Sequence, residues 1–132
     1  MNIQLISTRA IYVNLAPSDK KEDSESFSFD YQVDFPESSD SSFLVIIKSL
    51  LEEEDYSFET IYLAEFTTDV ALDDHFKRSR FPYVNAPAIA YPFFRAFIAN
   101  ALVNCGLKPT YLPSVNFEKL YQKKSDDAKK ES

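Results

Sequence analysis

The sequence predicts an α+β domain, with about four antiparallel strands followed by two helices on one side of the sheet. Strict alternation of apolar and polar side chains over 26–36 is typical of a half-buried strand. Near residue 90 the spacing of apolar side chains becomes helical. A chain of 132 residues is the size of one domain.

Three well-marked strands and one less regular strand account for the first two-thirds of the chain. The irregular strand covers about 2–14, and its alternation changes phase near Ser7. The segment 43–51 is almost continuously apolar, as in a strand with little exposed face. The polar gaps are too short for helical crossovers, so antiparallel neighbours are expected.

The strand within 56–72 separates its side chains onto two faces. The more apolar face carries Phe58, Thr60, Tyr62, Ala64 and Phe66. The opposite face carries Glu59, Ile61, Leu63 and Glu65. This second face is either an ordinary solvated sheet face with two incidental aliphatic residues or an acidic, mildly apolar docking surface for a partner.

Two helices follow an irregular, charged segment at 73–85. The first ends at Gly106, the only glycine, which suits the position after a helix. It begins at Pro92, or it begins near Asn85 and is kinked at Pro92. Asn116 is placed to cap a final helix over 117–124.

The polar residues at the end of the chain are expected to be disordered. The predicted organisation is a single domain over 1–124 and a polar tail over 125–132.

Composition excludes several classes of protein. A net charge of −7 disfavours a nucleic-acid partner, which requires clustered cations. The start of the chain lacks the apolar core of a signal peptide, and the apolar runs are short for a membrane span. The lone Cys105 fits a reducing cytoplasm.

Candidate catalytic residues are few, so we do not expect an enzyme, a metal site or a cofactor. A pair of Cys105 and His75 is disfavoured because a helix C-terminus destabilises a thiolate, and a buried or incidental cysteine is expected. Asp73, Asp74 and His75 lack a fourth metal ligand at a sensible spacing. A chain with one glycine cannot form a glycine-rich phosphate loop.

The helix before Gly106 is apolar or small nearly all round, which is more than one sheet face can cover. Its small side chains would allow a second helix to approach closely, and self-association is the simplest explanation. The candidate oligomer interface consists of Ala96, Ala99 and Val103.

The segments Y-P-F-F-R (91–95) and P-S-V-N-F (113–117) resemble the SecB family of protein-export chaperones. The order of the predicted elements matches that family over nearly the whole chain. I-Y-L-A-E-F (61–66) and R-A-I-Y-V (9–13) resemble its strands more weakly.

The resemblance implies a homotetramer, a dimer of dimers, in the bacterial cytoplasm. Such a chaperone binds unfolded preproteins without ATP and passes them to the SecA motor. The implied residues of the client groove are Tyr62, Phe93, Tyr111, Leu112, Phe117 and Tyr121. The implied SecA-docking residues are Leu63 and Glu65.

Three departures bear mainly on the SecA partner. The family's acidic residues after its first strand motif correspond to the uncharged positions 13–15. Ala86 replaces a cysteine, and the tail is mixed in charge. Two alternatives stay open: a SecB-like chaperone dedicated to one client, such as a toxin–antitoxin pair, and a binding domain for a small hydrophobic ligand.

Overall fold

The computed structural model describes residues 1–18 and 26–131. It divides into two compact units, Met1–Leu72 and Asp73–Ser132, which are described separately. Most of the polar connection expected at 17–25 lies outside the described residues.

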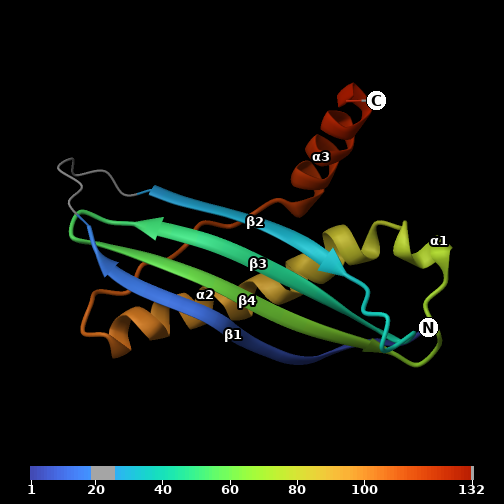
Figure 1. Ribbon diagram of the computed structural model, residues 1–132, viewed down its shortest axis with the longest axis horizontal. Helices are drawn as coiled ribbons and strands as arrows, with labels where there is room; N and C mark the ends of the chain where they lie inside the picture. The colour runs from blue at the N-terminus through green and yellow to red at the C-terminus, as the bar shows by residue number, and fades with distance from the viewer. Residues whose placement is uncertain (19–25, 132) are drawn as a thin grey trace. The chain divides into compact units, whose positions relative to one another are not determined.

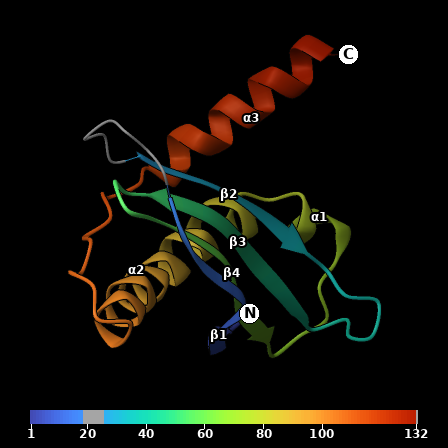
Figure 2. The ribbon, with the colours of Figure 1, turned by 60° about the vertical axis from the view of Figure 1, so that its left-hand side comes forward.

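The first unit is a four-stranded antiparallel sheet in the order β1-β4-β3-β2 (Figure 1). Its strands are β1 (Ile3–Pro17), β2 (Ser26–Asp34), β3 (Ser42–Glu52) and β4 (Tyr56–Thr68). The strands cross one another at an angle in Figure 2, as in the twisted sheets of other proteins. The sheet and its antiparallel pairing are as predicted.

One expectation about neighbours is wrong, because β1 pairs with β4 and not with β2. The burial of the strands gives the physical reason. β3 and β4 carry apolar side chains on both faces and occupy the centre, where both edges are paired. β2 has only polar side chains (Ser, Asp and Gln) on one whole face, and such a strand tolerates an edge.

The register places the large buried side chains of the sheet on one face. Phe43 and Phe66 are direct partners across β3 and β4, with ring centroids 5.0 Å apart. The other fully buried apolar side chains of these two strands are Val45, Ile47, Leu51, Phe58 and Ala64. This face is the apolar face that alternation along 56–66 predicts.

β1 is irregular where its sequence is irregular. Its register against β4 shifts between Leu5 and Ser7, which confirms the phase change predicted near Ser7. A second shift lies between Ala10 and Tyr12. Each bulge adds one unpaired residue and turns the following side chains to the other face.

Thr60 is a polar residue on the buried face, fully inaccessible to solvent. Among the described residues its Oγ1 is a buried side-chain atom with no hydrogen-bond partner. Its neighbours in the register are Val13 on β1 and Ser49 on β3. A buried hydroxyl without a partner costs about 1–3 kcal/mol.

We therefore expect Thr60→Val to raise the free energy of unfolding by about 1–2 kcal/mol, because valine has the same shape and no hydroxyl. Urea denaturation measures this change. Thr68→Val is the matched control, since the Thr68 hydroxyl donates to the Val70 carbonyl at 2.6 Å and its loss should destabilise. A destabilised Thr60→Val variant would show that the Thr60 hydroxyl has a partner in solution.

The second unit consists of helices. It contains the one-turn helix α1 (Asp74–Lys77), the π-helix η1 (Phe81–Asn85), α2 (Ala86–Asn104) and α3 (Phe117–Glu131). The open question about Pro92 is thereby answered, because η1 and α2 are continuous and Pro92 lies inside α2. The segment 73–85, expected to be irregular, is largely helical.

Both predicted helix caps are present. Gly106 has φ 82°, and its N–H donates to the Val103 carbonyl while the Leu107 N–H donates to the Leu102 carbonyl, both at 2.9 Å. This pattern is a Schellman motif, which needs a left-handed residue after the helix. At the start of α3, the Lys119 N–H donates to Asn116 Oδ1 at 3.1 Å.

α3 is longer than the sequence pattern predicts. The pattern ends the last helix at 124 and expects a disordered tail, whereas α3 continues to Glu131. The added residues are mostly Lys, Ala, Asp and Glu, and several of these types favour helix without any apolar spacing. The sequence pattern therefore places the end of this helix too early.

The continuous segment Phe81–Asn104 is long and apolar enough to cross a membrane by length and composition alone. In the structure 39% of its most apolar window is buried. Arg95 is the only charged residue between Phe81 and Asn104. Core helices of soluble proteins pass the same test. The individual apolar runs of this segment are short because Asn85, Arg95 and Asn100 interrupt them.

Candidate functional site

A cleft of about 470 Å³ lies in the second unit, beside the junction of η1 and α2. Its apolar walls are Val84, Ala88, Val115 and Phe117, and its polar rim is Ser114, Asn116 and Glu118. Apolar walls with a small polar rim suit an apolar side chain or a small apolar ligand.

An aromatic cluster supports the cleft from within the second unit. The Tyr91 ring lies 5.7 Å from the Phe117 ring, edge to face, and 5.8 Å from the Phe94 ring. The Tyr91 hydroxyl donates a 2.6 Å hydrogen bond to the Pro113 carbonyl. This bond fixes the loop between α2 and α3 against α2.

The protonation of Tyr91 favours this bond. Burial raises the pKa of the Tyr91 phenol, and the nearby Arg95 guanidinium only partly opposes that rise. The phenol is therefore a hydrogen-bond donor throughout the physiological pH range.

α3 is held against η1 by two side-chain contacts. The Tyr83 and Tyr121 rings stack with centroids 6.1 Å apart, and Arg80 forms an ion pair with Glu118. Burial, and then the neighbouring Tyr121, raises the pKa of Tyr83. An ion pair this exposed contributes little to stability, so the ring stack is the stronger contact.

The structure separates the predicted groove residues by exposure. Phe93 on α2 is 50% exposed, and Tyr111 in the following loop is 81% exposed. Leu112 and Phe117 are buried, and Tyr121 is half-buried. Phe117 lines the cleft, and Tyr121 lies one helical turn further along α3.

Tyr62 belongs to the first unit, where it is buried on β4. Its direct partners in the register are Ile47 on β3 and Ala10 on β1. Within its own unit Tyr62 is a residue of the apolar face of the sheet.

Sequence reasoning missed the cleft residues Val84, Ala88 and Val115. All three are small or branched aliphatic residues, and Val84 lies in the segment 73–85 that was expected to be irregular. The one available signal was Pro82, whose position near a helix start indicates that the helix begins before Asn85.

The predicted docking residues lie on the less buried face of β4. Leu63 and Glu65 are both half-buried, and the Ser7 hydroxyl lies 3.4 Å from Glu65 Oε2, to which it donates. Their register partners on β3 are Ile46 and Leu44. Glu65 is thus a carboxylate beside an aliphatic surface.

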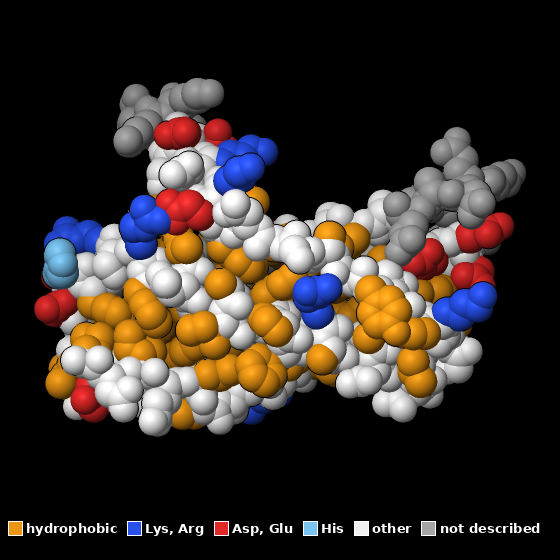
Figure 3. Space-filling model, turned by 180° about the vertical axis from the view of Figure 1, so that it is seen from behind, with side chains coloured by type: hydrophobic (Ala, Val, Ile, Leu, Met, Phe, Trp, Pro, Cys, Tyr) orange, Lys and Arg blue, Asp and Glu red, His pale blue; other side chains and the backbone are white. Residues whose placement is uncertain are grey.

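The predicted oligomer residues lie on the exposed side of α2. Ala96 and Val103 are exposed, and Ala99 is half-exposed. Ile89 and Phe93 continue this side toward the start of the helix. Figure 3 shows hydrophobic side chains gathered over the surface that α2 presents, with few charged side chains among them.

The described residues offer little chemistry for a reaction. Among them, no group of three or more His, Cys, Asp or Glu side chains is arranged to hold a metal ion. Cys105 is a free, exposed thiol directly after the end of α2. Of the two expectations for this residue, a buried cysteine is therefore wrong. The arrangement can bind apolar side chains.

Comparison with known proteins gives a consistent result. The family model described as preprotein translocase subunit SecB matches residues 16–128. Protein-export protein SecB of Janthinobacterium sp. (strain Marseille) and that of Herminiimonas arsenicoxydans are each 39% identical over 41 residues. These matches cover 31% of this chain and only 25% of each relative.

Two solved structures share the fold. A SecB-like chaperone of Mycobacterium tuberculosis, in complex with a ChAD peptide from an antitoxin, has a TM-score of 0.66 at 16% identity, over 86% of this chain and 87% of its own. A protein of unknown function from Streptococcus agalactiae has a TM-score of 0.55 at 7% identity, over 86% of this chain and 98% of its own.

Proposed function

The chain belongs to the SecB family, and we propose that it is an ATP-independent chaperone that holds unfolded preproteins. Family membership supports a chaperone role. The observation that carries the finer proposal is the pair of exposed aromatic side chains, Phe93 and Tyr111, in the unit that contains the apolar cleft.

Exposed aromatic side chains on a rigid support suit a client of variable sequence. Ring faces contact any apolar side chain that an unfolded chain offers, at a low cost in side-chain entropy. The Tyr91–Pro113 hydrogen bond and the Phe117 contact hold the loop that carries Tyr111 and Leu112. Leu112, Phe117 and Tyr121 are proposed as the supporting wall, and Tyr62 as a further contact.

We propose that the working form is a homotetramer built as a dimer of dimers. Exposed apolar side chains on two elements support self-association. Ala96, Ala99 and Val103 lie on α2. Edge strand β1 exposes Ile6, Ile11, Tyr12, Val13 and Leu15. Exposed apolar surface of this kind marks an interface.

A SecA-type motor is the proposed partner for delivery, docking at Leu63 and Glu65. We expect Glu65→Lys to weaken binding of SecA from the same bacterium about tenfold. The substitution replaces a negative charge, which would attract a basic partner surface, by a positive charge, which would repel it. Calorimetry of the purified pair measures the loss. Asp126→Lys on α3 is the matched charge control, and an equal loss in both variants would contradict the docking site.

A SecB-like chaperone dedicated to one client is the alternative favoured by an observation. The Mycobacterium tuberculosis neighbour was solved with an antitoxin peptide. Its fold covers most of this chain. A dedicated chaperone predicts tight binding of one client and weak suppression of aggregation for unrelated proteins. A binding domain for a small hydrophobic ligand predicts neither.

The other proposed properties follow from the same account. The protein acts in the bacterial cytoplasm, contacts no nucleic acid and does not insert into the membrane. It uses no cofactor, since holding a client requires only apolar contacts and main-chain hydrogen bonds.

Suppression of aggregation tests the proposed function directly. Citrate synthase heated alone scatters light, and an equimolar amount of this protein should suppress most of that scattering without nucleotide. Added ATP should make no difference. Unchanged scattering would contradict a general holdase, and suppression that requires ATP would contradict the mechanism.

A further inference from the structure

The loop between α2 and α3 carries two parts of the second unit on which the proposed function depends. Tyr111, 81% exposed, lies in this loop, and so do Ser114 and Val115, which line the cleft. The other cleft walls include Val84 on η1 and Ala88 on α2. The position of this loop therefore sets both where the exposed ring lies and how wide the cleft is.

Tyr91 joins the helix side of the cleft to its loop side. It lies on α2, one turn after Ala88, and its hydroxyl donates at 2.6 Å to the carbonyl of Pro113. Pro113 directly precedes Ser114 in the cleft lining. The Tyr91 ring also contacts the Phe117 ring, where α3 begins. One side chain therefore holds the loop at Pro113 and at the residue where the last helix begins.

Tyr91 itself is not placed to contact a client. It is 4% exposed, and its ring packs against the rings of Phe94 and Phe117. Its hydroxyl hydrogen is used in the bond to Pro113. An effect of this hydroxyl on client binding must therefore act through the loop.

A loop that is ordered before binding supports a higher affinity than a loop that the client must order. Fixing a flexible backbone costs conformational entropy, and a binding event that includes this cost is weaker. The caps at Gly106 and Asn116 hold the two ends of the loop, and the Tyr91 hydrogen bond holds its interior.

We propose that the Tyr91 hydroxyl is a positioning group for client binding. By holding the Pro113 carbonyl, it keeps Tyr111 and the loop side of the cleft in their binding arrangement before a client arrives. This inference rests on the proposed function and deepens it. The affinity of the site then depends on an atom that no client touches.

Tyr91→Phe tests the proposal, because it removes the hydroxyl and keeps the buried ring. Binding of labelled, reduced carboxymethylated α-lactalbumin should weaken about three- to tenfold, as expected for the loss of one buried hydrogen bond. In stopped-flow anisotropy the loss should fall on the association rate constant, since a smaller fraction of the free protein has the binding arrangement. A loss confined to the dissociation rate constant would indicate direct contact with the client and overturn the proposal.

The mobility of the loop is measured separately. The chain has no tryptophan, so Tyr111→Trp introduces a single fluorescent reporter into the loop. Its anisotropy decay in the free protein should show larger local motion when Tyr91 is also replaced by phenylalanine. Weaker client binding without this added motion would overturn the proposal, because the hydroxyl would then act by another route.

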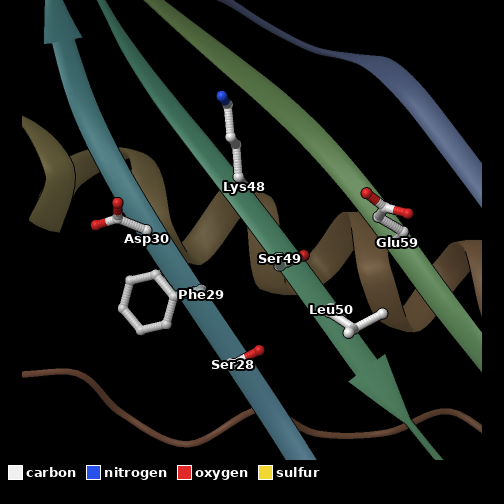
Figure 4. A pocket seen from close by; sticks show the side chains of 7 residues that line it. All are labelled: Ser28, Phe29, Asp30, Lys48, Ser49, Leu50 and Glu59. Atoms are coloured by element: carbon white, nitrogen blue, oxygen red, sulfur yellow. The ribbon is translucent and has the colours of Figure 1, made fainter.

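Two variants serve as controls. Tyr83→Phe removes a phenol hydroxyl from η1 and keeps the ring that stacks on Tyr121. Leu50→Ala removes an apolar side chain from a hollow of about 450 Å³ over β2, β3 and β4, where Figure 4 shows it between Ser28 and Glu59. Both variants should retain the client affinity within about twofold, a difference of about 0.4 kcal/mol. Losses as large as that of Tyr91→Phe in both controls would overturn the proposal.

The same measurements separate this inference from the proposed function. A parent protein that does not bind the unfolded polypeptide would refute the holdase. A parent protein that binds it, with Tyr91→Phe binding equally well, would refute the positioning role alone.

Discussion

Replacing Phe93 and Tyr111 together by alanine is expected to weaken binding of an unfolded polypeptide by about thirtyfold or more. Burial of each ring against a client contributes about 1–1.5 kcal/mol after the costs of ordering, and 1.4 kcal/mol is tenfold in affinity. Both side chains are at least half exposed, so their loss should leave the fold intact. Anisotropy with labelled, reduced carboxymethylated α-lactalbumin measures the affinity.

Val70→Ala is the control for this pair of substitutions. Val70 is an apolar residue of the first unit, 46% exposed in the segment after β4. If general apolar stickiness held the client, the Val70 variant would lose affinity in proportion. Unchanged affinity in the double variant would contradict the assignment of Phe93 and Tyr111 to client binding.

The second large effect is expected on assembly. Ala99→Leu should split the oligomer into smaller species, because the added methyl groups do not fit where two helices approach closely. Ala99 is half-exposed within one chain, so a leucine there is tolerated by the chain itself. Analytical ultracentrifugation measures the distribution of species.

Asp127→Leu adds a comparable apolar side chain at an exposed position of α3 and serves as the control. It should leave the assembly unchanged. An Ala99→Leu variant with the mass of the parent protein would exclude this side of α2 from the interface.

The sheet was predictable from the sequence because the alternation of apolar and polar residues along a strand indicates which face of the strand is buried. Every second residue from Phe58 to Phe66 is buried, which is the period of a strand. The order of the strands was not predictable in the same way. Pairing of β1 with β4 depends on which strands can tolerate an edge, and short connections suggested β2 as the neighbour.

The helical unit was harder to predict because some of its residues do not occupy their usual positions in a helix. Pro92 usually marks a helix start, but here it lies inside α2, beyond the π-helix that begins at Phe81. The cleft walls Val84, Ala88 and Val115 have no distinctive residue type, and a tertiary contact alone places them together. Gly106 and Asn116 were predictable, since each cap requires a particular residue.

The candidate site was predictable only in part for the same reason. An aromatic excess predicts that some rings are functional, but not which rings remain exposed. Phe93 and Tyr111 differ from Phe94 and Tyr91 only in their orientation on the helix and loop. The structure shows which rings are exposed. The spacing of the aromatic residues along the sequence does not predict it.

Light scattering of the purified protein, alone and with reduced carboxymethylated α-lactalbumin, tests the central proposal most directly. A tetrameric holdase predicts about four times the mass of one chain, rising by whole client molecules when the unfolded polypeptide is added. A monomer or dimer whose mass is unchanged by the unfolded polypeptide would contradict the proposal, and the cleft would then be a candidate site for a small hydrophobic ligand.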